Sequence, residues 1–289
     1  MTVAAGTVLL VHAHPDDELL STGVRLCHDV AAGRDVHVLT CTLGDEGEVI
    51  PPGLAHVVAG REGALASHRL GELRAALAAA GATSHVLAEA DGRARWRDSG
   101  MAGSAAADHP DAWVGSDDEA VDAVREVLAR VAPDVVVTYD AGGGYQHPDH
   151  VRTHAVTRAA VIAENAELAA DGRAPIRLEI ALTPASWARE DRAWVREHAE
   201  QLEALGWRIP AEDEGYPVSV VDDALVPIRV VDPAAARSRA EALRHHRTQV
   251  IVTADGQAHA LSNLVAARLP DREGYAEIDP VTGEHRSAG

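Results

Sequence analysis

The sequence has no lysine and no phenylalanine, and only two cysteines among its 289 residues. Without lysine the chain cannot use a P-loop lysine, a Schiff-base lysine or a lysine general base, which excludes several enzyme classes. Cys27 and Cys41 stand in a helical and a strand pattern, each between apolar residues. We therefore expect two buried free thiols in a reducing compartment, and not a disulfide or a cysteine-ligated metal.

Long hydrophobic runs and a basic leader are also missing. No stretch approaches the ~20 apolar residues that span a bilayer, and the first apolar run is too short for a signal core. Acidic residues outnumber basic ones 45 to 26, for a formal net charge of −19, so the surface would repel nucleic-acid phosphates. We expect a cytoplasmic protein that binds neither nucleic acid nor a membrane; its oligomeric state carries no signal in the sequence.

Short apolar runs alternate with longer amphipathic ones, and the hydrophobic content of 46% is enough for a large core. Alternating strands and helices are typical of a parallel sheet covered on both faces. We therefore predict an α/β fold with a Rossmann-like, mostly parallel sheet, helices on both faces and a mixed C-terminal elaboration. The expected strands are 7–13, 35–43, 84–88 and 133–139, and the expected helices are 16–32, 61–80, 118–131 and one that starts near Pro148.

The pattern becomes mixed beyond residue 175, with a strand in 176–182, a Trp-bearing helix near 186–205, strand-like residues in 217–231 and a helix over 234–246. We expect one domain over 1–289: a core that holds the site in 1–175, an elaboration packed on the sheet in 176–269, and a polar tail in 270–289.

Two polar segments follow strands of the expected core. "HAHPDDE" (12–18) comes after the first strand, and "DAGGGYQHPDH" (140–150) comes after the strand at 133–139. In an open parallel sheet, ligands bind beyond the carboxyl ends of the strands, where the strand order reverses. With the order 3-2-1-4 these two strands are neighbours, so both segments should converge on one crevice.

A hydrolytic metal site needs two imidazoles and one carboxylate, with one position left for water, and His14, Asp17 and His150 supply that set. Asp16 cannot point the same way as its neighbour, so it could act as general base on the water. Zn²⁺ suits such a set, and Fe²⁺ is also accepted.

The second segment adds His147, which lies on the same side of a helix as His150, and Asp149, which could hydrogen-bond an imidazole and orient it. Taken alone, each segment could simply begin a helix, with its aspartates as caps or its proline in the first turn. Two such segments after adjacent core strands favour the metal site.

At these residues the chain resembles the N-acetylglucosaminyl-phosphatidylinositol de-N-acetylase-like (LmbE-like) zinc hydrolases, through "HPDDE" (14–18) and "GGGYQHPDH" (142–150). Within that family it is most similar to the deacetylase branch of actinobacterial mycothiol biosynthesis. The further segments that carry this resemblance are "TCTLGDEGEVI" (40–50), "RLGEL" (69–73), "RWRDSGMAG" (95–103) and "TQVIV" (248–252).

The resemblance implies metal-dependent removal of an N-acetyl group from a small amino-sugar inositol, 1-O-(2-acetamido-2-deoxy-α-D-glucopyranosyl)-1D-myo-inositol. The alternatives are the sister amidase that cleaves mycothiol S-conjugates, which bears a lysine where this chain has Ser21, and another LmbE-like N-acetylglucosamine deacetylase. By motif position, the implied roles are zinc ligands at His14, Asp17 and His150, a general base at Asp16, a transition-state-stabilising His147 supported by Asp149, a mobile carbonyl-polarising Tyr145, and substrate-hydroxyl ligands at Arg69 and Asp98.

Overall fold

The computed structural model describes residues 6–57 and 63–286. Its strands are β1 (Thr7–His12), β2 (Asp35–Thr40), β3 (Thr83–Val86), β4 (Val135–Tyr139), β5 (Arg177–Pro184), β6 (Val220–Val221), β7 (Ile228–Val231), β8 (Ile251–Val252), β9 (Ala258–Ala260), β10 (Ala267–Arg268) and β11 (Arg272–Ile278). Its helices are α1 (Asp17–Ser21), α2 (Gly23–Ala31), α3 (Ala64–Ala80), α4 (Asp118–Val131), α5 (Gly143–Gln146), α6 (Pro148–Ala170), α7 (Ala185–Glu197), α8 (Ala199–Glu203) and α9 (Pro233–Leu243).

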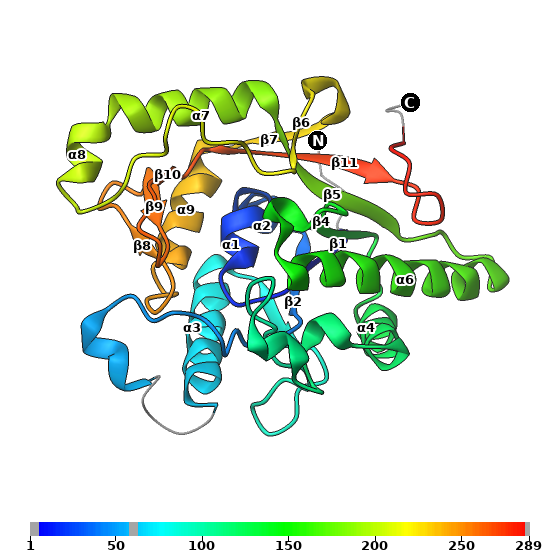
Figure 1. The fold of residues 1–289 in the computed structure, drawn as a ribbon. Helices are drawn as coiled ribbons and strands as arrows, with labels where there is room; N and C mark the ends of the chain where they lie inside the picture. The colour runs from blue at the N-terminus through cyan, green and yellow to red at the C-terminus, as the bar shows by residue number, and fades with distance from the viewer. Residues whose placement is uncertain (1–5, 58–62, 287–289) are drawn as a thin grey trace.

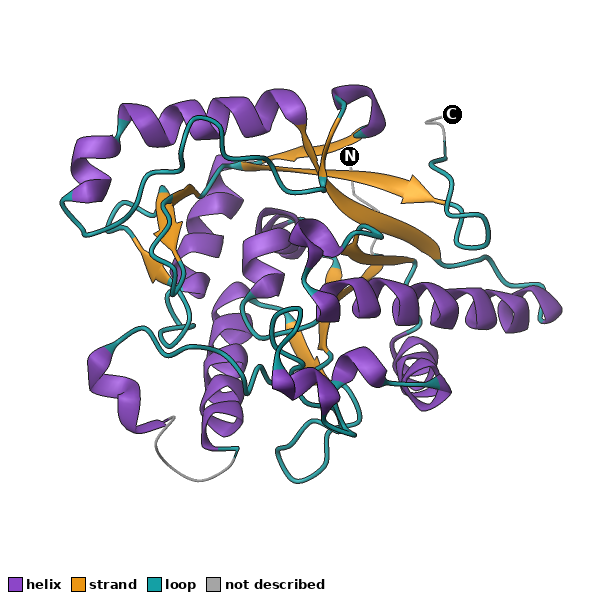
Figure 2. Ribbon diagram, viewed as in Figure 1, coloured by secondary structure: helices purple, strands orange, loops and turns teal. Residues whose placement is uncertain are grey.

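The main sheet runs in the order β3-β2-β1-β4-β5-β11-β7, with the short β6 beside β5 (Figure 1). Its pairs from β3 through β5 are parallel, and β11 is antiparallel to both β5 and β7. The predicted fold class and the strand order 3-2-1-4 are therefore confirmed. A separate small antiparallel sheet joins β8, β9 and β10 (Figure 2).

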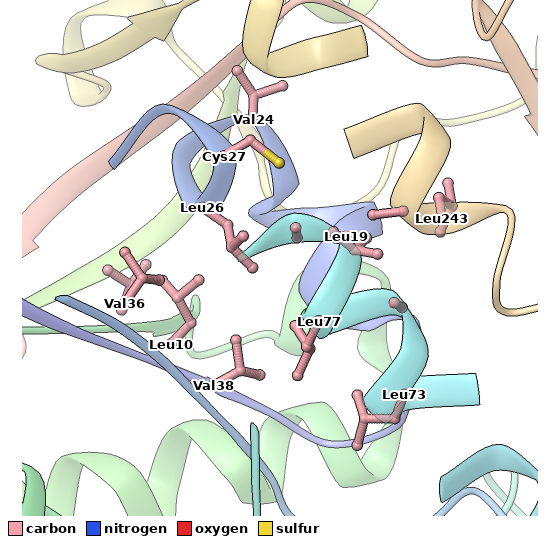
Figure 3. Packing of buried hydrophobic residues seen from close by; sticks show 14 of the residues in the cluster. Leu10, Leu19, Val24, Leu26, Cys27, Val36, Val38, Leu73, Leu77 and Leu243 are labelled. Carbon is pink, nitrogen blue, oxygen red and sulfur yellow. The ribbon is translucent and has the colours of Figure 1, made fainter. Parts of the chain in front are cut away.

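Successive side chains of the central strand β1 enter two different cores, because neighbouring residues of a strand point to opposite faces. Val8 and Leu10 pack with α2, α3 and α9, and Figure 3 shows Leu10 beside Val36 and Val38, on the side of the sheet that faces Leu73 and Leu77 of α3. Leu9 and Val11 pack with α4 and α6 on the other face. Helices thus cover both faces, as predicted, and the sheet centre is rigidly held between them.

The helix predicted over 16–32 is two helices, α1 and α2, because the backbone of Thr22 is not helical. The Thr22 hydroxyl donates to the Glu18 carbonyl at 3.0 Å and faces His12 Nε2 at 2.9 Å, so it accepts from that ring nitrogen. Gly23 then allows a close approach, since a Cβ there would lie 2.4 Å from Arg239 Cγ. Of the helix predicted over 61–80, residues 61 and 62 lie outside the described residues, and α3 covers Ala64–Ala80.

The prediction of a polar tail over 270–289 is wrong. Residues 272–278 form β11, which lies between β5 and β7 and buries Tyr275, Ala276 and Ile278. The charged residues in this segment made it look like an exposed tail in the sequence. One of them, Glu273, accepts hydrogen bonds from the backbone of α2 inside the fold. The C-terminal part therefore completes the main sheet and does not merely pack on it.

Both cysteines are free and buried, as expected. Within the described ranges, no helix combines the length and the apolar character that crossing a bilayer requires.

The role of β11 gives a stability prediction. Ile278→Ala should lower the free energy of unfolding by about 2–5 kcal/mol, because it leaves a cavity beside a fully packed strand. Val281→Ala, three residues further on at a side chain that is 68% exposed, should change it by less than about 0.5 kcal/mol. Urea unfolding of both variants measures the difference; equal and negligible effects would restore the polar-tail interpretation.

Candidate active site

The two polar segments meet at the carboxyl ends of β1 and β4, which are adjacent parallel strands. The first segment leads into α1, which begins at Asp17, and the second leads into α6, which begins at Pro148. Asp17 Oδ2 lies 3.2 Å from His14 Nδ1 and 3.3 Å from His150 Nε2. All three of these side chains are buried.

Both contacts of Asp17 Oδ2 have the length expected between two ligands of one ion, although the predicted set His14, Asp17 and His150 does not bring one ligand atom from each residue within 4.8 Å of the others. Two ligands that are each ~2.0–2.1 Å from a tetrahedral zinc lie about 3.3 Å apart, which matches both distances from Asp17 Oδ2. Neither ring nitrogen of the buried His150 has a hydrogen-bond partner among the described residues, although its ring stacks on Tyr139 with centroids 4.2 Å apart. Burial would raise the pKa of Asp17, but the two facing imidazoles hold it well below its usual range.

The far side of His14 contacts the carboxylate of Asp149. His14 Nε2 lies 3.1 Å from Asp149 Oδ2, which also accepts a hydrogen bond from the Ser99 backbone at 2.9 Å. Burial would lower the pKa of His14, but the carboxylates of Asp98, Asp149 and Asp17 around its ring hold that pKa well above its usual value. Each ring nitrogen therefore carries a proton toward a carboxylate, and a metal ion bound at Nδ1 would take the place of the proton that faces Asp17. The imidazole that the Asp149 carboxylate contacts is that of His14, and the implied support of His147 by Asp149 stays a prediction.

His147 contacts Asp149 in a different way, as the N-cap of α6. Its Nδ1 accepts a hydrogen bond from the Asp149 backbone at 3.2 Å. Burial lowers its pKa to about 4, so the ring is neutral and its proton is on Nε2.

Among the described residues, two sets place one ligand atom each within 4.8 Å of the others: His14, His147 and His150, and His14, Asp98 and Asp149. The tautomer of His147 favours a hydrogen-bond donor at that position over a ligand.

Asp16 has an unusual backbone, with φ of 109° and ψ of −32°. Such a conformation at a non-glycine residue costs on the order of 1–3 kcal/mol and is typical of functional sites. Burial raises the pKa of the Asp16 carboxyl to about 6, against the opposing effect of Arg69, whose Nη2 lies 3.5 Å from its Oδ2. Asp16 directly precedes Asp17 in the chain. A carboxylate with a pKa of about 6 can accept a proton near neutral pH.

Arg69 is buried and is not the solvated surface charge that its position in a helical pattern could also have indicated. It donates hydrogen bonds to the Pro15 carbonyl at 2.6 Å and to the Gly44 carbonyl at 2.7 Å. Asp98 is also buried, and its Oδ1 lies 3.5 Å from His14 Nε2. Both residues are brought to the site, and their contacts with substrate hydroxyls stay predictions.

Tyr145 is half exposed at the mouth of the cluster, where its ring meets that of His150 edge-on with centroids 5.0 Å apart. Gly143 and Gly144 precede it with φ of 64° and 72°, a conformation that favours glycine. A cavity of about 250 Å³ adjoins this tyrosine and is lined by Ser21 and Trp187 among others.

Sequence reasoning missed several residues that support the site. Tyr139 accepts a hydrogen bond from the Ala13 backbone through its hydroxyl, and Trp113 donates to the Asp149 carbonyl and the Thr153 hydroxyl. Glu18 pairs with His246, 228 positions away. Glu18 stands inside the "HPDDE" motif, whereas nothing near His246 in the sequence signals its position.

Residues 9–161 match the family described as PIG-L, GlcNAc-PI de-N-acetylase. The chain is 43% identical over 284 residues to a 1D-myo-inositol 2-acetamido-2-deoxy-alpha-D-glucopyranoside deacetylase of Actinosynnema mirum, covering 96% of this chain and 94% of that protein. This chain belongs to the GlcNAc-PI de-N-acetylase family.

Two solved structures share the fold at 18% identity. One is an N,N'-diacetylchitobiose deacetylase from Pyrococcus horikoshii, with a TM-score of 0.52 over 85% of this chain and 71% of that chain. The other is GalB, a 4-carboxy-2-hydroxymuconate hydratase from Pseudomonas putida, with a TM-score of 0.55 over 98% of this chain and 100% of that chain. The fold alone therefore does not define the reaction; the site must.

The imidazole of His150, whose nitrogens have no hydrogen-bond partner among the described residues, gives a prediction about metal content. His150→Ala should weaken divalent-metal binding by more than about 100-fold, because losing a ligand exceeds the 10–100-fold loss typical of its outer partners. His109→Ala, which removes an exposed histidine away from the cluster, is the control for loose surface binding. Chelator competition with elemental analysis measures both; equal affinity in the two variants would contradict the site.

Proposed function

We propose that this protein is a zinc-dependent N-deacetylase of mycothiol biosynthesis. Its substrate would be 1-O-(2-acetamido-2-deoxy-α-D-glucopyranosyl)-1D-myo-inositol, which it would hydrolyse to acetate and the free amine. The observation that carries the reaction type is the contact of Asp17 Oδ2 with two imidazoles beside the strained Asp16. The substrate comes from the activity in the name of the Actinosynnema mirum relative.

His14, Asp17 and His150 would hold the metal ion. When bound, a divalent ion supplies a water of pKa ~7 and polarises the acetyl carbonyl, which amide hydrolysis at neutral pH requires. Two imidazoles and one carboxylate form the donor set of a hydrolytic zinc site, and the same set accepts Fe²⁺.

Asp16 acts as general base and takes a proton from the attacking water. Its carboxyl is next to Asp17 in the chain, and its Oδ2 lies 3.5 Å from Arg69 Nη2. Its pKa of about 6, raised by burial, leaves it mostly ionised at neutral pH and still able to hold a proton during the reaction.

Tyr145 and His147, whose rings meet edge-on with centroids 6.0 Å apart, act on the acetyl group. The Tyr145 hydroxyl donates to the developing oxyanion, and the half-exposed position of its ring leaves room for it to approach. His147 carries its proton on Nε2 and can stabilise the same charge. The leaving amine must be protonated: Asp16 can return the proton it took, whereas the neutral His147 would first have to gain a second proton.

Asp16→Asn should lower kcat for acetate release by about 100- to 10,000-fold, because the general base is lost while the proposed ligands remain. Metal content should stay at the wild-type level. Asp118→Asn, at an exposed position in the first turn of α4, is the matched control and should keep full activity. An Asp16→Asn protein with bound metal and undiminished acetate release would refute this mechanism.

The identity of the substrate is tested by comparing kcat/KM for the N-acetylglucosaminyl inositol with kcat/KM for a bimane conjugate of mycothiol. We expect the pseudodisaccharide to be preferred, since Ser21, where the amidase branch bears a lysine, lines the cavity beside Tyr145. Faster cleavage of the conjugate would assign the chain to that amidase reaction instead.

A further inference from the structure

The peptide that joins Pro15 to Asp16 is held from both sides. Arg69 donates to its carbonyl oxygen at 2.6 Å, and its N–H donates to Glu18 Oε2 at 2.9 Å. The orientation of this peptide sets φ of Asp16, which is 109°. The backbone of the proposed general base is thus kept in a strained conformation by two buried side chains.

Glu18 has a second, long-range partner. Its Oε1 accepts a hydrogen bond from His246 Nε2 at 2.7 Å, and neither side chain has any exposed surface. A glutamate that only capped α1 would have no need of this partner, because a cap on a helix surface can be completed by water. A carboxylate removed from water needs a charge-assisted donor to stay ionised and fixed.

The turn that carries His246 is itself anchored. It follows α9, and the backbone N–H groups of Gln249 and Val250 close it on the His246 carbonyl. Thr248 donates to the Glu72 carboxylate through both its N–H and its hydroxyl, at 2.9 and 2.6 Å. Glu72 is on α3, one turn beyond Arg69. The same helix therefore supports both contacts of the Pro15–Asp16 peptide: the Arg69 contact directly, and the Glu18 contact through the turn that carries His246.

We propose that His246 is a positioning residue for the deacetylation: acting through Glu18, it holds the Pro15–Asp16 peptide so that the Asp16 carboxylate faces the attacking water. This inference rests on the proposed function of Asp16. It assigns His246 no contact with substrate or metal. The predicted signature is a loss in kcat with little change in KM or in metal content.

The test uses the full-length, metal-loaded protein and a pair of variants of similar size. His246→Leu fills the space but lacks a donor, and it should lower kcat by about 10–100-fold, the effect of a small misplacement of a catalytic group. His246→Gln can place an N–H near the position of Nε2 and should restore most of kcat. Leu202→Ala, at a buried site in α8 outside this network, controls for lost stability; it should lower Tm and leave kcat unchanged.

A double-mutant cycle separates positioning from general support. In an Asp16→Asn background, His246→Leu should change kcat by less than about twofold, because the group it positions is already disabled. Equal losses in both backgrounds, equal losses in the Leu and Gln variants, or a loss of metal in His246→Leu would each overturn the inference. If His246→Leu is insoluble, His246→Met, which also lacks a donor, takes its place with the same expected outcomes.

Acetate release by the wild-type protein shows whether a negative result contradicts only the role of His246 or the proposed function as well. A wild-type protein that releases acetate, with a His246→Leu variant that matches it, would overturn the positioning role alone. A metal-loaded wild type that releases no acetate from the pseudodisaccharide would overturn the proposed function, and the inference with it.

Discussion

The contact of one carboxylate oxygen with imidazoles from two distant loops organises this protein. Asp17 Oδ2 can lie within 3.3 Å of His150 only because β1 and β4 are neighbours in parallel register, which brings their carboxyl ends together. The packed faces on either side of the sheet keep these strands from shifting. The arrangement of the core therefore determines the distance between two proposed metal ligands, Asp17 and His150, that are 133 positions apart in the chain.

A layer of buried polar groups surrounds that contact and determines what each inner side chain can do. Asp149 contacts His14 through its carboxylate and His147 through its backbone N–H, so the two neighbouring imidazoles have different surroundings. Carboxylates raise the pKa of His14, whereas burial lowers the pKa of His147. Arg69 and Glu18 hold the strained Asp16 peptide. Each of these charges is buried, and each is stable there because it faces a matched partner.

The sequence predicted most of this arrangement, because the ligands follow strands whose apolar runs and order are readable. The prediction from sequence failed where the structure depends on individual contacts that the apolar pattern does not show. The charged residues around Tyr275 concealed β11, whose partners are more than 40 positions away along the chain. The Thr22 hydroxyl broke a helix whose apolar spacing continued without interruption. The apolar spacing placed His246 at the end of a helix predicted over 234–246, but α9 ends at Leu243 and His246 lies in the turn beyond it, where its role depends on one contact with Glu18.

The most direct test of this account is to locate the metal itself, by anomalous diffraction from zinc-loaded crystals. The account predicts one strong peak bounded by His14 Nδ1, a carboxylate oxygen of Asp17 and His150 Nε2, with His147 outside the coordination sphere. A peak liganded by His147, a peak between Asp98 and Asp149, or no ordered metal at this position would contradict it.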